Sequence, residues 1–152
     1  MRLLDDRRLK RIDQRVDYFL RRYSIPALRL SLGVVFLWFG ALKIAGYTPV
    51  TDLVARTVYW VDPGWFVPVL GVAEVFVGIG LITRRLMRLV LAVFALQMAG
   101  TFLVLILLPG VAFQAGNYLL LTVEGEFVIK NLVLLTAGMV VGATVHRRSE
   151  RL

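Results

Sequence analysis

The sequence contains no cysteine and a single histidine, His146. The lack of cysteine excludes disulfides, thiol relays and thiolate metal sites formed within this chain. A lone histidine, with no second histidine or methionine arranged beside it, makes no credible haem or metal site. We therefore expect no metal.

Motifs of familiar enzyme classes are also missing. No phosphate-binding loop, dinucleotide fingerprint, nucleophile elbow or metal-spaced cluster is present. No dense relay of Asp, Glu and His suggests a pump. We expect a protein that is not catalytic on its own and has no cofactor, with a bound quinone or lipid as the open alternative.

Acidic residues are few, since 10 Asp and Glu face 18 Lys and Arg, for a net charge of +8. In a soluble protein this excess would raise the question of nucleic acid. Here 59% of the residues are hydrophobic, against roughly 45–50% in soluble domains. The surplus apolar surface faces lipid, so we expect a bilayer and no nucleic acid as partner.

Apolar runs are what the chain has in abundance, and four of them occupy residues 27–45, 66–83, 89–108 and 127–145. Each is about 18–20 residues long and can cross a hydrocarbon layer of ~30 Å at a rise of ~1.5 Å per residue. The sequence predicts an all-α, polytopic membrane protein whose four-transmembrane-helix bundle covers residues 26–146.

Basic residues gather on one side of these spans. They are dense before the first span, between spans two and three, and in the tail 147–152, whereas the other two connections contain only Arg56. Loops rich in Lys and Arg stay in the cytoplasm. We therefore expect a multi-pass protein of a plasma (inner) membrane with both termini cytoplasmic.

Residues 3–23, within an N-terminal unit 1–25, have the pattern of an amphipathic helix. One predicted face carries the apolar residues Leu9, Ile12, Val16, Phe19 and Tyr23. Such a helix lies in the headgroup layer, with its basic face toward anionic lipid. The alternative is a solvated tail. Ser24 and Pro26 predict a turn into span one.

The two outer connections have different characters. In the first, Thr48-Pro49 predicts a short helix over 50–60, and Asp62-Pro63 predicts the start of span two. The second, 109–126, is unusually apolar. It folds back onto the membrane, caps the bundle or offers a partner surface.

Four polar residues inside the spans form a candidate ligand-binding pocket. Glu74 lies near the bilayer midplane, where an ionised side chain costs at least about 2.5 kcal/mol, so it is expected to face the bundle interior and a partner. Lys43, Gln97 and Lys130 are the candidate partners. Spans one, two and four contribute the charged residues, all in their outer halves.

Each of these residues also has a purely structural interpretation. Lys43 and Lys130 can snorkel to the interface, and Lys130 can pair with Glu126 one turn earlier. Gln97 can serve as a hydrogen bond between helices, and Glu74 can hold helices together as a neutral or paired carboxyl. Small residues allow close helix contact, namely Gly71 and Gly78 in span two and Gly138 and Gly142 in span four.

Two stretches resemble the DoxX-like superfamily. Residues 29–43 run from Arg29 through a Leu-, Gly- and Phe-rich segment to Phe-Gly40 and then Lys43, similar to the first-helix signature. Gly71-Val-Ala-Glu74 and the glycines after it resemble the second helix. Tyr-Thr-Pro at 47–49 and residues 125–132 are similar to the YkgB-like branch. The resemblance covers about 27–145, and the Arg-rich N-terminus is not part of the pattern.

The resemblance implies a small four-helix membrane protein, often associated with redox or oxidative-stress systems. Some members are subunits of quinone-linked oxidoreductases, and distant relatives act as membrane chaperones or assembly factors. It also implies that Gly40, Lys43, Glu74 and Lys130 are signature positions, with Gly40 a helix-packing glycine.

Three functions follow from these observations. The first is an accessory membrane protein that stabilises or assembles a redox or stress-response complex with another membrane protein, or as a homo-oligomer. The second is a quinone- or lipid-binding subunit of an oxidoreductase. The third is a small proton-coupled transporter.

Overall fold

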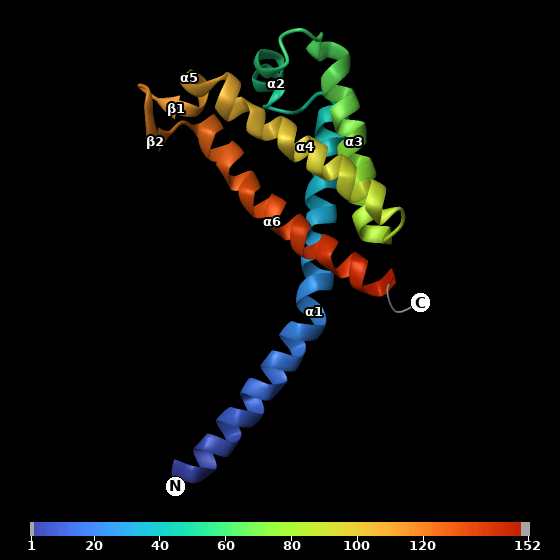
Figure 1. Ribbon diagram of the computed structural model, residues 1–152, viewed down its shortest axis with the longest axis vertical. Helices are drawn as coiled ribbons and strands as arrows, with labels where there is room; N and C mark the ends of the chain where they lie inside the picture. The colour runs from blue at the N-terminus through green and yellow to red at the C-terminus, as the bar shows by residue number, and fades with distance from the viewer. Residues whose placement is uncertain (1, 150–152) are drawn as a thin grey trace.

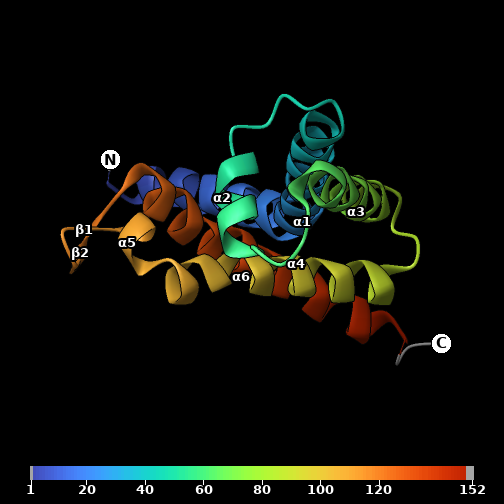
Figure 2. The same cartoon turned by 90° about the horizontal axis from the view of Figure 1, so that it is seen from above.

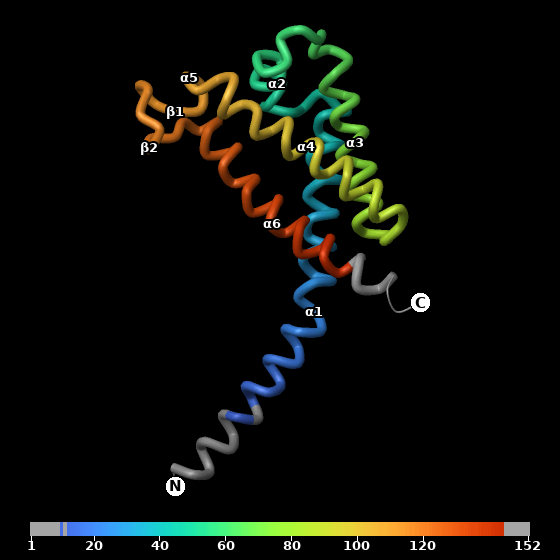
Figure 3. The backbone as a smooth tube through the Cα atoms, in the orientation of Figure 1, coloured from blue at the N-terminus to red at the C-terminus, as the bar shows by residue number. Residues whose placement is uncertain are grey.

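The computed structural model describes the backbone of residues 2–149 and the side chains of Lys10 and residues 12–144 (Figure 3). Its elements in chain order are α1 (Arg2–Ile44), α2 (Thr51–Thr57), α3 (Pro63–Thr83), α4 (Met87–Leu107), α5 (Pro109–Ala112), β1 (Phe113–Gln114), β2 (Asn117–Leu121) and α6 (Val123–Ser149).

The four predicted spans are confirmed as long apolar helices. Those long and apolar enough to cross a membrane are Ile12–Ile44, Pro63–Thr83, Met87–Leu107 and Val123–Thr144. The chain is thus a multi-pass membrane protein in contact with the bilayer. The all-α class holds, and one small antiparallel hairpin of β1 and β2 is added in the second outer connection, with Phe113 opposite Leu121.

The predicted turn at Ser24 and Pro26 is wrong, because α1 runs through both residues without a break. Proline removes one backbone hydrogen bond and crowds the carbonyl four residues earlier, which bends a helix but does not always end it. The inner part of α1 therefore projects beyond the bundle (Figure 1), and its described side chains up to Ser24 are exposed. Leu9 of the predicted apolar face lies outside the described side chains.

The two outer cap predictions have opposite outcomes. At α3, Asp62 accepts a hydrogen bond from the Gly64 backbone N–H at 2.9 Å, with Pro63 as the first helical residue, as predicted. At α2, the helix begins only at Thr51. Its N-cap residue is Val50 and not Thr48, so no side chain caps this helix. Thr48 Oγ1 instead accepts from the Val50 N–H at 3.5 Å within the preceding turn.

The helices are arranged as two pairs, α1 with α3 and α4 with α6 (Figure 2). Their inner halves meet in one apolar core that includes Phe36, Val77, Val90, Phe94 and Val141. At the opposite end, which is called the outer end by its place in the fold alone, α2 lies over the two helix pairs. The beginning of α1, the end of α6 and the α3–α4 turn lie at one end of the molecule, and α2, α5 and the hairpin lie at the other (Figure 1).

Candidate binding cavity

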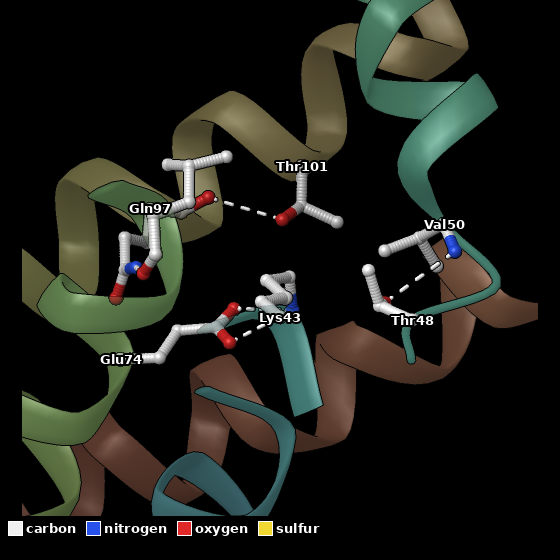
Figure 4. A network of polar contacts seen from close by, with 7 residues as sticks. Lys43, Thr48, Val50, Glu74, Gln97 and Thr101 are labelled. Carbon is white, nitrogen blue, oxygen red and sulfur yellow. Dashed lines mark hydrogen bonds and ion pairs between the residues drawn. The ribbon is translucent and has the colours of Figure 1, made fainter. Parts of the chain in front are cut away.

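An ion pair joins α1 to α3 in the outer half of the bundle. Lys43 Nζ lies 2.9 Å from Oε1 and 2.8 Å from Oε2 of Glu74 (Figure 4). The two side chains are only 11% and 17% exposed. As expected, Glu74 lies in the interior of the bundle and contacts a polar partner. That partner is Lys43.

Glycines make this contact geometrically possible. A Cβ atom added to Gly40 would lie 2.6 Å from the carbonyl oxygen of Gly71, and one added to Gly71 would lie 2.7 Å from that of Gly40. The backbones of α1 and α3 can approach this closely only because neither position has a side chain. Lys43 lies three residues after Gly40 and Glu74 three residues after Gly71, so the close approach sets the two charges face to face.

The ion pair retains hydrogen-bonding capacity of both kinds. An ammonium group has three donors, of which the Glu74 carboxylate takes two, and a carboxylate has about four acceptor sites. One N–H donor and further acceptor lone pairs thus remain side by side. The positive and negative charges cancel, so the pair as a whole is neutral.

The ion pair borders a cavity of about 820 Å³ between the two helix pairs, beneath α2. This volume falls in the range of ~300–1,000 Å³ that is typical of small-molecule sites. Most of the lining is aliphatic or aromatic. The polar lining residues are Lys43, Thr57, Glu74, Gln97, Thr101, Lys130 and Asn131.

Gln97 lines this cavity and also ties α4 to α3. Its Nε2 donates to the carbonyl oxygen of Leu70 at 3.3 Å, which is the interhelical hydrogen bond expected of an amide in a span. Its Oε1 is buried and has no hydrogen-bond partner among the residues that the structure describes. Thr101, one turn later, donates to the main-chain oxygen of Gln97 at 3.1 Å.

Lys130 borders the cavity, but its ammonium group has a different partner. Nζ lies 3.0 Å from Oε2 of Glu126, one turn earlier on α6, and the side chain is 74% exposed. The structure therefore pairs Lys130 locally and does not bring it to Glu74. Of the four predicted pocket residues, three lie in the interior of the bundle and Lys130 lies at the rim.

Two buried polar residues of the cavity were not predicted as site residues. Asn131 donates to the Phe127 carbonyl at 2.8 Å, and the Thr57 hydroxyl donates to the Leu53 carbonyl at 2.6 Å. A polar residue inside an apolar span is a signal that points to Asn131. No local signal points to Thr57, because its burial depends on α2 folding back over the bundle.

The remaining predicted glycines all lie at or near helix contacts. A Cβ at Gly78 would lie 2.7 Å from the Gly33 carbonyl on α1, a partner that was not predicted. A Cβ at Gly138 would collide with the Phe94 ring on α4, and one at Gly142 would lie 3.4 Å from Leu91. Gly138 and Gly142 thus face α4.

A protein-family profile described as DoxX matches residues 25–107. The matched segment contains Gly40, Lys43, Glu74 and Gln97 and ends before Lys130. No curated protein and no solved structure matches the chain.

Proposed function

Because the chain belongs to the DoxX family of integral membrane proteins, we propose that it binds a neutral amphiphilic molecule of the bilayer beside Lys43 and Glu74. One observation carries this proposal, namely a cavity of about 820 Å³ with apolar walls and a single buried ion pair. It makes specific the quinone- or lipid-binding alternative that the sequence left open.

The ion pair selects for a ligand without net charge. Lys43 and Glu74 already neutralise each other, so a charged head group would introduce an uncompensated charge into a poorly solvated site, which is strongly unfavourable. A hydroxyl group or a carbonyl group fits the remaining hydrogen-bonding capacity. The hydroxyl can donate to Glu74 and accept from Lys43, whereas the carbonyl can accept only from Lys43.

The walls of the cavity support a ligand with an apolar chain that comes from the bilayer. Leu96 on α4 and Val133 on α6 line the cavity and are also exposed on the outside of the bundle. Apolar surface therefore continues from the cavity to the region that faces lipid. Quinones, isoprenoid alcohols and neutral lipids are molecules of this class.

The test is to identify what the purified protein retains. The wild-type chain and the variants Glu74→Gln and Lys43→Met are purified in a mild detergent, and bound molecules are extracted and quantified by mass spectrometry. We expect the wild type to retain a neutral amphiphile in stoichiometric amount. Loss of a hydrogen bond to a charged group is worth ~1.5–3 kcal/mol, so each variant should bind about 10- to 140-fold more weakly.

Lys130→Gln is the matched control, because it removes a lysine at the cavity rim whose partner is Glu126. It should retain the ligand at the wild-type level. Wild-type protein that carries no neutral amphiphile, and binds none when a quinone or a diacylglycerol is added, contradicts the proposal.

The accessory function remains the second candidate, and one observation favours it. The hairpin at the outer end presents apolar side chains, with Leu119 90% exposed and Tyr118 and Leu120 beside it also exposed. Such a patch suits another membrane protein or a second copy. Leu119→Ser should release a partner that co-purifies with the wild type, while Glu74→Gln should not.

We also propose that the chain belongs to the YkgB-like branch of the family. This assignment depends on residues 47–49 and 125–132, and the second of these stretches lies beyond the matched segment. We also propose cytoplasmic termini in an inner membrane, with α1 crossing the headgroup layer there as one continuous helix. For the transporter alternative, the measurement is proton-coupled flux in liposomes.

A further inference from the structure

Arg29 closes the inner end of α3. Its Nη1 donates to the carbonyl oxygens of Leu81 and Ile82 at 2.6 and 3.2 Å. These carbonyls belong to the last turn of α3, whose end carries partial negative charge. Arg29 therefore compensates the partial negative charge of these carbonyls. Without Arg29, that charge would attract the arginines of the following turn.

The turn itself carries three more arginines. Arg84, Arg85 and Arg88 lie between the end of α3 and the first turn of α4, and all three are exposed. Within the described side chains, no carboxylate lies within ion-pair distance of any of them. The turn thus offers three guanidinium groups within five residues, and the nearby carbonyls are taken by Arg29.

Apolar side chains lie directly beside these charges. Leu86 sits between the arginines and Leu89 follows them, and both are exposed. The turn joins two membrane-spanning helices, so it lies at the boundary between hydrocarbon and headgroups. A guanidinium group can donate two parallel hydrogen bonds to the oxygens of one phosphate group. The neighbouring leucines can contact acyl chains.

From this arrangement we infer that the α3–α4 turn is a binding site for the phosphate headgroup of an anionic phospholipid, with Arg84, Arg85 and Arg88 as its ligands. Basic residues next to a membrane-spanning helix attract anionic phospholipids at the membrane surface. Leu86 and Leu89 favour a lipid over a soluble phosphate. The site lies at the end of the bundle opposite the cavity and does not depend on the function proposed for the cavity.

The experiment uses the full-length chain in nanodiscs that contain phosphatidylglycerol and phosphatidylcholine in equal amounts in both leaflets. Native mass spectrometry counts the lipids that stay bound after release from the nanodisc. We expect the wild type to retain phosphatidylglycerol in preference to phosphatidylcholine. Each arginine near the surface contributes about fivefold, so Arg84→Gln with Arg88→Gln should lower this preference about 25-fold.

The matched control removes the same charge at the other end, as Arg56→Gln with Lys130→Gln, and should keep the preference. An equal loss in the control means that net charge alone attracts the lipid and overturns the site. A wild type without any preference for phosphatidylglycerol overturns it as well, whether or not the variants fold. A third contrary outcome is that inorganic phosphate alone, at matched ionic strength, displaces the lipid and raises the unfolding temperature, which assigns the site to a soluble anion.

Discussion

At the scale of single residues, Lys43 and Glu74 depend on each other. Each is a charge in a region where an isolated charge is expensive, and each supplies the counter-charge that the other needs. Removing one partner leaves the other uncompensated, whereas removing both leaves an apolar contact. Comparing the single variants with the double variant therefore separates the contribution of the ion pair to the free energy of unfolding from the contributions of the two side chains.

We predict that Glu74→Leu and Lys43→Met each lower the free energy of unfolding by about 3 kcal/mol, and that the double variant loses much less than the sum. Unfolding in mixed micelles with increasing dodecyl sulfate gives the three values. Additive losses would mean that the two side chains are not coupled.

A second prediction concerns the glycine contact that holds the pair together. Gly40→Ala places a methyl group against the Gly71 carbonyl, which should cost ~1–3 kcal/mol and separate Lys43 from Glu74. A Cβ added to Gly100 on α4 meets no described atom within 4 Å outside its own turn of helix, so Gly100→Ala should be neutral or stabilising by up to ~1 kcal/mol. The same unfolding measurement compares them, and equal effects would refute close packing at Gly40.

At the scale of elements, α1 is the helix that differs most from expectation. It continues through Pro26 and carries its inner part past the bundle as one helix. A helix that lies in the headgroup layer needs a bend before the span begins. The distance between the two halves of α1 therefore distinguishes the two arrangements.

Spin labels at Ile12→Cys and Trp38→Cys measure that distance, and the chain has no native cysteine to interfere. Both positions are exposed. A continuous helix at ~1.5 Å per residue places them about 39 Å apart, and a right-angled turn at Pro26 places them about 28 Å apart. We predict the longer distance. Labels at Leu89→Cys and Ile106→Cys within α4 calibrate the method at about 26 Å.

At the scale of the whole molecule, the beginning of α1, the end of α6 and the arginine-rich α3–α4 turn share one end, and the hairpin lies at the other (Figure 1). An even number of spans requires the shared end, and we propose from the charge bias that this end faces the cytoplasm. In the proposed orientation, the cavity and the Lys43–Glu74 pair belong to the half of the bundle that faces away from the cytoplasm.

This orientation predicts the labelling of single cysteines in intact cells. A membrane-impermeant maleimide should react with Tyr118→Cys in the hairpin and with Leu86→Cys only after the membrane is opened. Both residues are exposed, so access decides the outcome. The reverse pattern would invert the topology and place the cavity in the cytoplasmic half.

The sequence by itself determined the features that arise from the solvent and from neighbours along the chain. Hydropathy over a span's length is a sum over consecutive residues, so the four spans could be read directly. The Asp62 cap involves a group two residues away, and the Glu126–Lys130 pair lies within one helical turn. The cost of a charge at the midplane predicted that Glu74 has a polar partner.

Only the tertiary structure decided which partner Glu74 has and what surrounds the pair. Lys43, Gln97 and Lys130 were equivalent candidates, because the choice depends on how closely two helices approach and where they cross. That approach results from Gly40 and Gly71 meeting, a property of two helices together that neither shows alone. The cavity, the position of α2 above it and the burial of Thr57 likewise arise only when segments distant in sequence pack against one another.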